Sequence, residues 1–200
     1  MGVCSICWVR NRRAQPFQRV PVGKNPQQCN SSYSYIFAEI LPTEETMKWV
    51  TREKARVDRI ACPWLIRKFI DKGAEFLYVP KEKVMEVVQK DGATPFDTPG
   101  AELHHYEENG KEFVSFDAII KKYKLTDPAL LELAKIVRVA DGGSGSEIEA
   151  AGLEAAATGF RMMAKDDFEN QRLQFPLYDA LYTYCKWKVE EKGKLEHTGH

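Results

Sequence analysis

The sequence lacks an excess of charge and lacks any long apolar run, and both absences narrow the class of protein. Its 29 Lys and Arg residues balance 29 Asp and Glu residues over 200 positions. Proteins that bind nucleic acid or a membrane surface usually carry excess positive charge, so we expect neither partner. No apolar stretch approaches the ~20 residues that a membrane-spanning helix needs.

Cysteine is also scarce. The chain has five cysteines, and an odd number does not indicate a disulfide framework. Cys4 and Cys7 have the spacing of half a zinc site, but no second pair lies at a suitable distance. After Val9 the N-terminus turns basic instead of continuing into the apolar core of a signal peptide. These features are typical of a cytoplasmic protein.

Three regions differ in character along the chain. Residues 1–46 are polar and turn-prone without a sustained period, and we interpret them as an irregular or disordered N-terminal extension. Residues 47–188 carry an orderly alternation of elements and form the expected single domain. Residues 189–200 are rich in Lys and Glu, and we expect them to fray.

The patterns predict an α+β domain that is mostly helical, with a small sheet from its N-terminal half. β-Rich or extended segments are expected at 48–51, 75–79, 94–98, 102–106 and 112–115, and the first helices at 57–70 and 81–90. Asn109-Gly110 is a strong turn signal.

The second half of the chain reads as helices with recognisable starts. Ser115 can cap one helix, and Asp127 followed by Pro128 is typical of the start of the next. Ser146 and Glu149 have the spacing of a capping box. We expect Pro176 to open the last helix, over 177–188.

The segment VDRIACPWLIRKF, residues 57–69, is the densest in functional side chains. On a helix, Asp58 and Cys62 share one stripe with Leu65 and Phe69. A cysteine near a helix start can become nucleophilic or ligate a metal. Alternatively, Cys62 is inert packing among core residues. Dithiol chemistry is not expected, because Leu65 stands where a second cysteine would be needed.

A second cluster contains Glu102, His104 and His105, with Asp97 upstream and Asp117 downstream. A histidine with carboxylates suits zinc, manganese or iron. The spacing is not diagnostic, and adjacent histidines beside a hairpin turn can simply be solvated. Asp117 can instead complement the N-terminus of its own helix.

A third hint comes from Arg138 and Asp141. Helical projection places both at or near the apolar face of the segment 129–141, where a charge must be paired or used. A structural ion pair and a functional site both fit this pattern. Asp179 projects away from the apolar side of its helix, and we interpret it as solvated.

Several long strings resemble one known family. They are KWVTREKARVDRIACPWLIRKFID, AEFLYVP, ATPFDTPGAELHH, SFDAIIKKY, DPALLELAKIVRVAD and PLYDALYTYC. In matching order, from about Met47 to Cys185, they resemble the C-terminal domain of the ChrB family of chromate-resistance proteins. Full-length members are thought to be chromate-responsive regulators with an additional N-terminal domain, for which residues 1–46 are too short.

The resemblance also implies site residues. Relatives tend to read E-L-G-H where this chain reads Glu102-Leu103-His104-His105, so any family role falls to His105. The matching strings imply a site that includes Glu102, His105 and Asp117, whose side chains would suit a divalent metal. They also imply a ligand-binding set of Asp58, Arg59, Cys62, Trp64, Arg67, Arg138, Asp141 and Asp179.

Three hypotheses follow. In the first, the chain is a sensor or accessory domain that binds chromate through Arg59, Arg67 and Arg138, or a divalent metal such as zinc, iron or manganese. In the second, it is a metal- or thiol-dependent detoxifying enzyme with an open coordination position or a thiolate at Cys62. In the third, it is an interaction module whose charged pairs are only structural.

Overall fold

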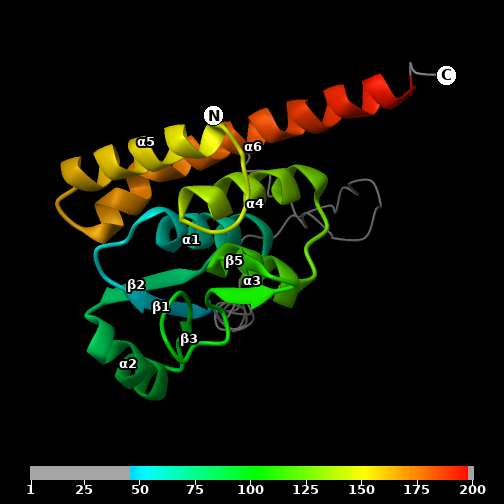
Figure 1. The fold of residues 1–200 in the computed structure, drawn as a ribbon. Coiled ribbons are helices and arrows are strands. Elements are labelled where there is room, and N and C mark those ends of the chain that lie inside the picture. The colour runs from blue at the N-terminus through cyan, green and yellow to red at the C-terminus, as the bar shows by residue number, and fades with distance from the viewer. Residues whose placement is uncertain (1–45, 198–200) are drawn as a thin grey trace, which may run out of the picture. The chain divides into compact units, whose positions relative to one another are not determined.

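The computed structural model describes residues 46–197, so the interpretation of residues 1–45 lies outside the described part. The described elements, in chain order, are β1 (Lys48–Arg52), α1 (Val57–Phe69), β2 (Glu75–Val79), η2 (Lys81–Lys83), α2 (Val84–Asp91), β3 (Thr94–Pro95), β4 (Tyr106–Glu108), β5 (Lys111–Phe113), α3 (Ser115–Tyr123), α4 (Pro128–Ala140), α5 (Glu149–Met163) and α6 (Asp167–His197). Figure 1 shows the small sheet beneath a larger set of helices. The predicted α+β class, mostly helical with a sheet from the N-terminal half, is confirmed.

The main sheet has three parallel strands in the order β2-β1-β3. Successive side chains of the central strand point to opposite faces. Trp49 packs into the main core, and Val50 packs with Val84 and Ala93 in a smaller apolar cluster. Both faces of β1 are therefore covered, which explains why its residues do not alternate between apolar and polar.

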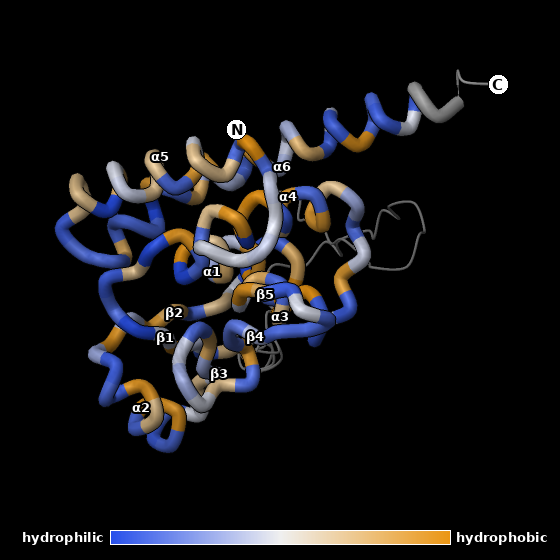
Figure 2. Tube along the Cα trace, viewed as in Figure 1, coloured by the Kyte–Doolittle hydropathy of each residue, from blue (hydrophilic) through white to orange (hydrophobic). Residues whose placement is uncertain are grey.

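The helices enclose the main core around α1. Apolar side chains of α1, α3, α4 and α6 are buried together, and α6 packs against α1, α4 and α5. Figure 2 shows apolar residues where α1 and α4 meet, whereas the far end of α6 is mostly hydrophilic. No helix in the described range is long and apolar enough to cross a bilayer.

The first half of α6 also holds the loop that joins β1 to α1. The Asp167 carboxylate accepts the backbone N–H groups of Lys54 and Ala55 at 2.7 and 2.8 Å. The Asn170 side chain donates to the Ala55 carbonyl at 3.1 Å, and the Tyr178 hydroxyl donates to the Val57 carbonyl at 3.0 Å. The start of α1 is thereby fixed by residues of α6 that are more than 110 positions away in the sequence.

Of three predicted helix caps, one is confirmed and two are wrong. Asp127 caps α4 as predicted, because its carboxylate accepts the Leu130 N–H at 2.7 Å. The cap predicted at Ser115 is wrong: Val114 is the N-cap, and the N–H of Ser115 donates to Asp58. The capping box at Glu149 is also wrong, because that carboxylate binds Tyr184 and Lys188 of α6.

The predicted start of the last helix is wrong as well. The helix α6 begins at Asp167, and Pro176 lies inside it. The Asp166 carboxylate accepts the Glu169 N–H at 2.7 Å, and the Glu169 carboxylate accepts the Lys165 N–H at 3.0 Å. This reciprocal cap satisfies early amides, so the helix forms upstream of the proline.

Two predicted segments are shorter or divided. The expected helix over 81–90 is a turn of 3₁₀ helix followed by α2, and of 94–98 only Thr94–Pro95 form a strand. A single bridge joins Phe96 to Leu103. Asp97 adopts a left-handed backbone with a φ of 43°, which turns the chain away from the sheet.

Candidate functional site

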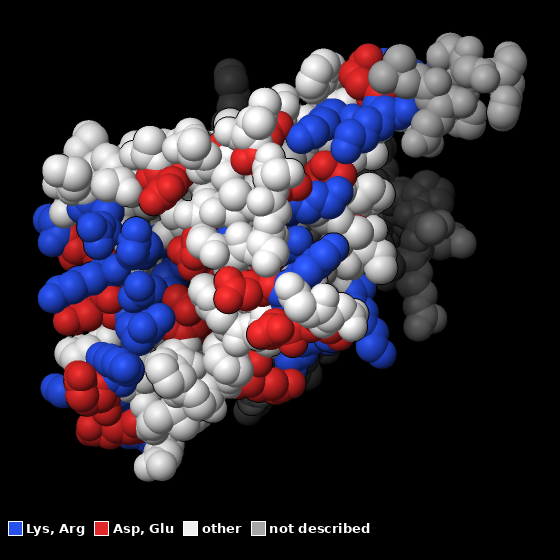
Figure 3. Space-filling view, viewed as in Figure 1, with Lys and Arg blue, Asp and Glu red and all other residues white. Residues whose placement is uncertain are grey.

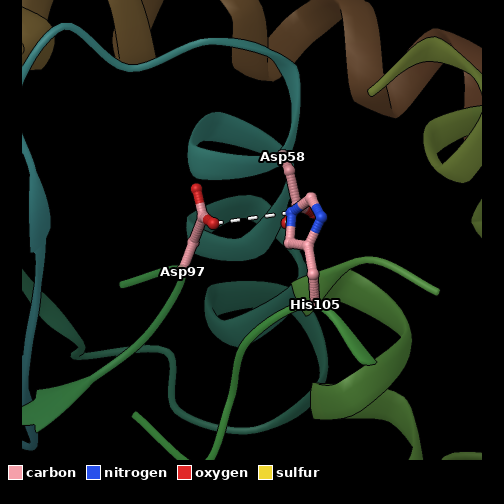
Figure 4. Close-up of side chains that lie close together, drawn as sticks. All are labelled: Asp58, Asp97 and His105. Carbon is pink, nitrogen blue, oxygen red and sulfur yellow. Dashed lines mark ion pairs between the residues drawn. The ribbon is translucent and has the colours of Figure 1, made fainter. Parts of the chain in front are cut away.

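Three carboxylates converge on one imidazole nitrogen. Nε2 of His105 lies 3.5 Å from Oδ2 of Asp58, 3.5 Å from Oδ1 of Asp97 and 3.4 Å from Oδ2 of Asp141. Figure 4 shows Asp58, Asp97 and His105 directed toward one another from three segments of the chain. We call these four residues the carboxylate–histidine cluster.

The fold brings the cluster together from four places. Asp58 lies in the first turn of α1, and Asp97 follows β3. His105 immediately precedes β4, and Asp141 ends α4. The carboxyl ends of parallel strands share one edge of a sheet, which places the segment after β1 near the segment after β3.

Asp58 forms the buried wall of the cluster, with 1% of its side chain exposed. Its two carboxylate oxygens accept the N–H groups of Ser115 at 2.9 Å and Phe116 at 3.1 Å. These amides open α3, and a helix N-terminus favours a negative charge. Burial is the main influence on the pKa of Asp58 and raises it, whereas the hydrogen bond with His105 lowers it.

Asp97 is held by two arginines. Nε of Arg59 lies 3.0 Å from its Oδ2, and a terminal nitrogen of Arg52 lies 3.3 Å from its Oδ1. Nε of Arg52 also donates to the Asp97 carbonyl at 2.9 Å, and Arg59 donates to the Glu53 carbonyl at 2.9 Å. Burial and then the Asp58 charge raise the pKa of Asp97 to about 6, against the opposing effect of the arginines.

His105 is the most accessible member, with 46% of its side chain exposed. Hydrogen bonds to Asp141 and then to Asp58 raise its pKa to about 10, so the imidazole is protonated at neutral pH. The ring therefore supplies a positive charge at the point on which the three carboxylates converge.

The side chains of the cluster are suitable metal ligands. One candidate ligand atom each from Asp58, Asp97 and His105 lies within 4.8 Å of the other two. Carboxylate oxygens combined with an imidazole nitrogen suit manganese, iron or zinc. The backbone amides at Asp58 and the arginines at Asp97 orient the carboxylates from behind, as the outer partners in metal sites do.

The structure places the predicted site residues in several groups. Asp58, His105 and Asp141 lie in the cluster, and Arg59 supports it. Glu102 is exposed and forms an ion pair with Lys122. The predicted metal set of Glu102, His105 and Asp117 is thus dispersed among separate partners.

Asp117 belongs to a two-residue ion pair. Arg138 donates from Nε to Oδ2 of Asp117 at 2.9 Å and from a terminal nitrogen to Oδ1 at 2.6 Å. The same Oδ2 accepts the Val114 N–H at 3.1 Å. The pairing of Arg138 therefore joins α4 to the start of α3.

The remaining predicted ligands have structural partners. Arg67 donates to the Ala74 carbonyl at 3.1 Å. Asp179, predicted to be solvated, is 54% exposed at its side chain but accepts Nε1 of Trp64 at 3.1 Å and pairs with Lys68. Cys62 is fully buried, and desolvation raises the pKa of its thiol well above the ordinary value. The thiol therefore remains protonated near neutral pH.

Two residues of the site were missed or undervalued. Asp97 lies close to the histidines in the sequence but is absent from both predicted ligand sets, and so is Arg52. Both stand at the carboxyl ends of β3 and β1, and Asp58 and Arg59 follow β1. The shared edge of a parallel sheet was the signal that could have joined them.

Comparison with known proteins gives a consistent identification. The family model described as ChrB, C-terminal domain, matches residues 49–185. Protein ChrB of Cupriavidus metallidurans (strain ATCC 43123 / DSM 2839 / NBRC 102507 / CH34) is 36% identical over 146 residues, which cover 72% of this chain and 42% of that protein. The chain thus spans less than half the length of this relative, and no solved structure matches. The chain belongs to the ChrB C-terminal domain family, as its strings predicted.

Proposed function

We propose that this domain serves chromate resistance by binding a divalent metal ion at the carboxylate–histidine cluster. Membership of the ChrB family links the chain to chromate resistance. The observation that carries the metal proposal is the convergence of the Asp58, Asp97 and Asp141 carboxylates on Nε2 of His105. Manganese, iron and zinc are the metals that this ligand set favours.

The alternative, direct binding of chromate by the predicted arginines, has less support. A dianion at the cluster would face three carboxylates at short range. Arg59 and Arg138 already pair with Asp97 and Asp117, and Arg67 donates to a backbone carbonyl. Chromate would have to replace these partners, whereas a divalent cation would replace the proton on Nε2 of His105 and meet the three carboxylates there.

The cluster also supports an open coordination position. Asp58 is almost fully buried, whereas nearly half of the His105 side chain is exposed. A metal held against the Asp58 wall would therefore keep an outward-facing position for water or another ligand. Such a position is what the enzyme alternative requires, because catalytic metal sites leave one coordination place open.

The test is metal binding by the full chain, purified without a tag or chelator. Elemental analysis and titration calorimetry with Mn²⁺, Zn²⁺ and anaerobic Fe²⁺ are expected to show one site. We expect His105→Ala and Asp97→Asn to weaken binding by about 100-fold, which is about 2.7 kcal/mol.

Glu102→Gln provides a matched control, since Glu102 pairs with Lys122 outside the cluster. It is expected to retain the affinity of the wild type. The proposal fails if the wild-type protein binds none of these metals or if His105→Ala binds them equally well. A rise in melting temperature with chromate that His105→Ala retains and Arg59→Met abolishes would favour the oxyanion alternative.

A further inference from the structure

A separate hollow lies beside the loop that joins β1 to α1. Its volume is about 530 Å³, and it is bounded by that loop, by β2 and by the turn from α5 into α6. Pockets that bind small molecules typically have volumes of about 300–1,000 Å³. The hollow is therefore large enough for an organic molecule and much larger than a single tetrahedral oxyanion.

Three cationic side chains line the hollow, namely Lys54, Arg161 and Lys165. Within the described residues, none of the three forms an ion pair. Figure 3 shows Lys and Arg side chains gathered over this end of the molecule, where the α5–α6 turn lies close to the β1–α1 loop in Figure 1. The charged heads are thus available to a ligand.

The acidic residues of the lining are less available. The Asp167 carboxylate accepts the N–H groups of Lys54 and Ala55, and the Asp166 carboxylate accepts the N–H of Glu169. Both also lie at the start of α6, where the helix dipole offsets negative charge. The lining acids thus equal the lining cations in number, but both oxygens of Asp167 and one of Asp166 are occupied by backbone N–H groups, whereas the three cationic heads have no ion-pair partner among the described residues.

An apolar wall faces the same space. Phe168 is 55% exposed, and its ring meets the ring of Tyr78 edge to face with centroids 5.4 Å apart. Met162 is 79% exposed and lies on the lining as well. An exposed aromatic ring next to uncommitted cations matches a ligand that has both an apolar and an anionic part.

The walls of the hollow are fixed before any ligand arrives. Lys54 has a left-handed backbone with a φ of 59°, held in place by Asp167. This conformation costs a lysine about 1 kcal/mol relative to glycine. Asn170 ties the same loop to α6 through the Ala55 carbonyl. Strained residues of this kind gather at ligand sites, where surrounding contacts maintain them.

We propose that this hollow binds an organic anion. Its charged group lies on Lys54, Arg161 and Lys165, and its apolar part lies on Phe168 and Tyr78. The proposal is independent of the metal site, because none of these five residues belongs to the carboxylate–histidine cluster.

The probe for the test is 8-anilinonaphthalene-1-sulfonate, which combines one sulfonate with aromatic rings and fluoresces in apolar surroundings. Titration of the folded full chain is expected to show saturable binding at one site. The double variant Lys54→Gly with Arg161→Ala is expected to bind about tenfold more weakly, since two charge-assisted contacts are lost. Lys54→Gly suits the left-handed backbone, so this substitution preserves the fold while removing a cation.

The matched control is Lys90→Gln, which removes an exposed lysine outside the hollow and is expected to bind the probe like the wild type. Inorganic phosphate, at constant ionic strength, is expected to displace the probe by competing for the cations. Far-ultraviolet circular dichroism confirms that each variant is folded. Equal affinity in the double variant, absence of saturable binding to the wild type or failure of phosphate to compete would each overturn the proposal.

Discussion

Within residues 46–197, buried charges occur in two places, and the two differ in how their charged atoms are arranged. In the Arg138–Asp117 pair, one guanidinium meets one carboxylate through two hydrogen bonds. In the carboxylate–histidine cluster, three carboxylates share a single imidazole nitrogen. A matched pair satisfies its own charges, whereas the cluster directs several oxygens at one point. The convergence of several ligand oxygens on one point therefore distinguishes this candidate site from the Arg138–Asp117 pair better than burial does.

The surroundings of the two places agree with this difference. The Arg138 guanidinium lies over the Phe113 ring, 4.6 Å from its centroid, and its side chain is 18% exposed. His105 is 46% exposed and opens the cluster to solvent. The pair is enclosed and complete, whereas the cluster remains accessible to a ligand.

The largest effect on stability is expected from Asp58→Ala. This substitution leaves the N–H groups of Ser115 and Phe116 buried without acceptors, and it removes one carboxylate of the proposed metal site. We expect a loss of about 3–5 kcal/mol in the free energy of unfolding together with loss of metal binding. Chemical denaturation and calorimetry measure the two effects. Asp58→Asn keeps one acceptor oxygen, so its free energy of unfolding should lie between those of Asp58→Ala and the wild type. If Asp58→Ala had the same free energy of unfolding as the wild type, the assigned contacts would be contradicted.

A smaller loss of stability, with no loss of metal binding, is expected from Arg138→Leu. The change leaves Asp117 buried without its partner, and we expect it to lower the free energy of unfolding by about 3 kcal/mol. The double variant with Asp117→Asn should recover part of this loss. If Arg138→Leu abolished metal binding in a folded protein, the distinction between pair and cluster would be incorrect.

Arg59→Lys tests how far the arginine that holds Asp97 contributes to the carboxylate–histidine cluster. Lysine keeps the charge but cannot hold Asp97 and the Glu53 carbonyl with one planar fork. We expect metal affinity to fall about tenfold, with a loss of about 1 kcal/mol in stability. Calorimetry at fixed pH tests the affinity. Lys68→Arg, at a salt bridge outside the cluster, is the matched control and should leave metal affinity unchanged.

The smallest effect concerns Glu149, which lies apart from both places. Hydrogen bonding to Lys188 lowers the pKa of this carboxyl from 4.5 to about 2. Its ionised form therefore stabilises the fold above pH 4.5, and this contribution disappears as the pH falls toward 2. Solvent screening limits the contribution to about 0.5 kcal/mol. The difference in melting temperature between the wild type and Glu149→Gln should shrink as the pH falls; a difference that grew would reverse the assigned sign.

Local signals predicted much of the fold. The apolar run at β2 lies between Gly73 and Pro80, and its predicted range is the observed one, Glu75–Val79. Asp127 and Pro128 also marked the start of α4. The failures at Ser115 and Glu149 have one physical cause. Their expected local partners were replaced by Asp58 and by residues of α6, which are distant in the sequence.

The candidate site was predicted only in part for a similar reason. Helical projection placed Asp141 near a buried face, and resemblance assigned a role to His105 and Asp58. Neither periodicity nor resemblance indicated that Asp97 would join them, since its position depends on a left-handed turn and on two arginines from another segment. The choice between Glu102 and Asp97 as a neighbour of His105 is made by tertiary structure.

The hydrogen bonds between α6 and the β1–α1 loop affect when the domain can complete its fold during synthesis. Lys54 and Asp167 are 113 residues apart in the chain, so the β1–α1 loop leaves the ribosome long before the Asp167 side chain that binds it. At about 5–20 residues per second, the delay is roughly 6 to 23 s. During this interval a nascent chain has Asp58 and Arg59 without the contacts that fix the start of α1. We therefore expect the carboxylate–histidine cluster to reach its final geometry late in translation, after the first half of α6 has emerged.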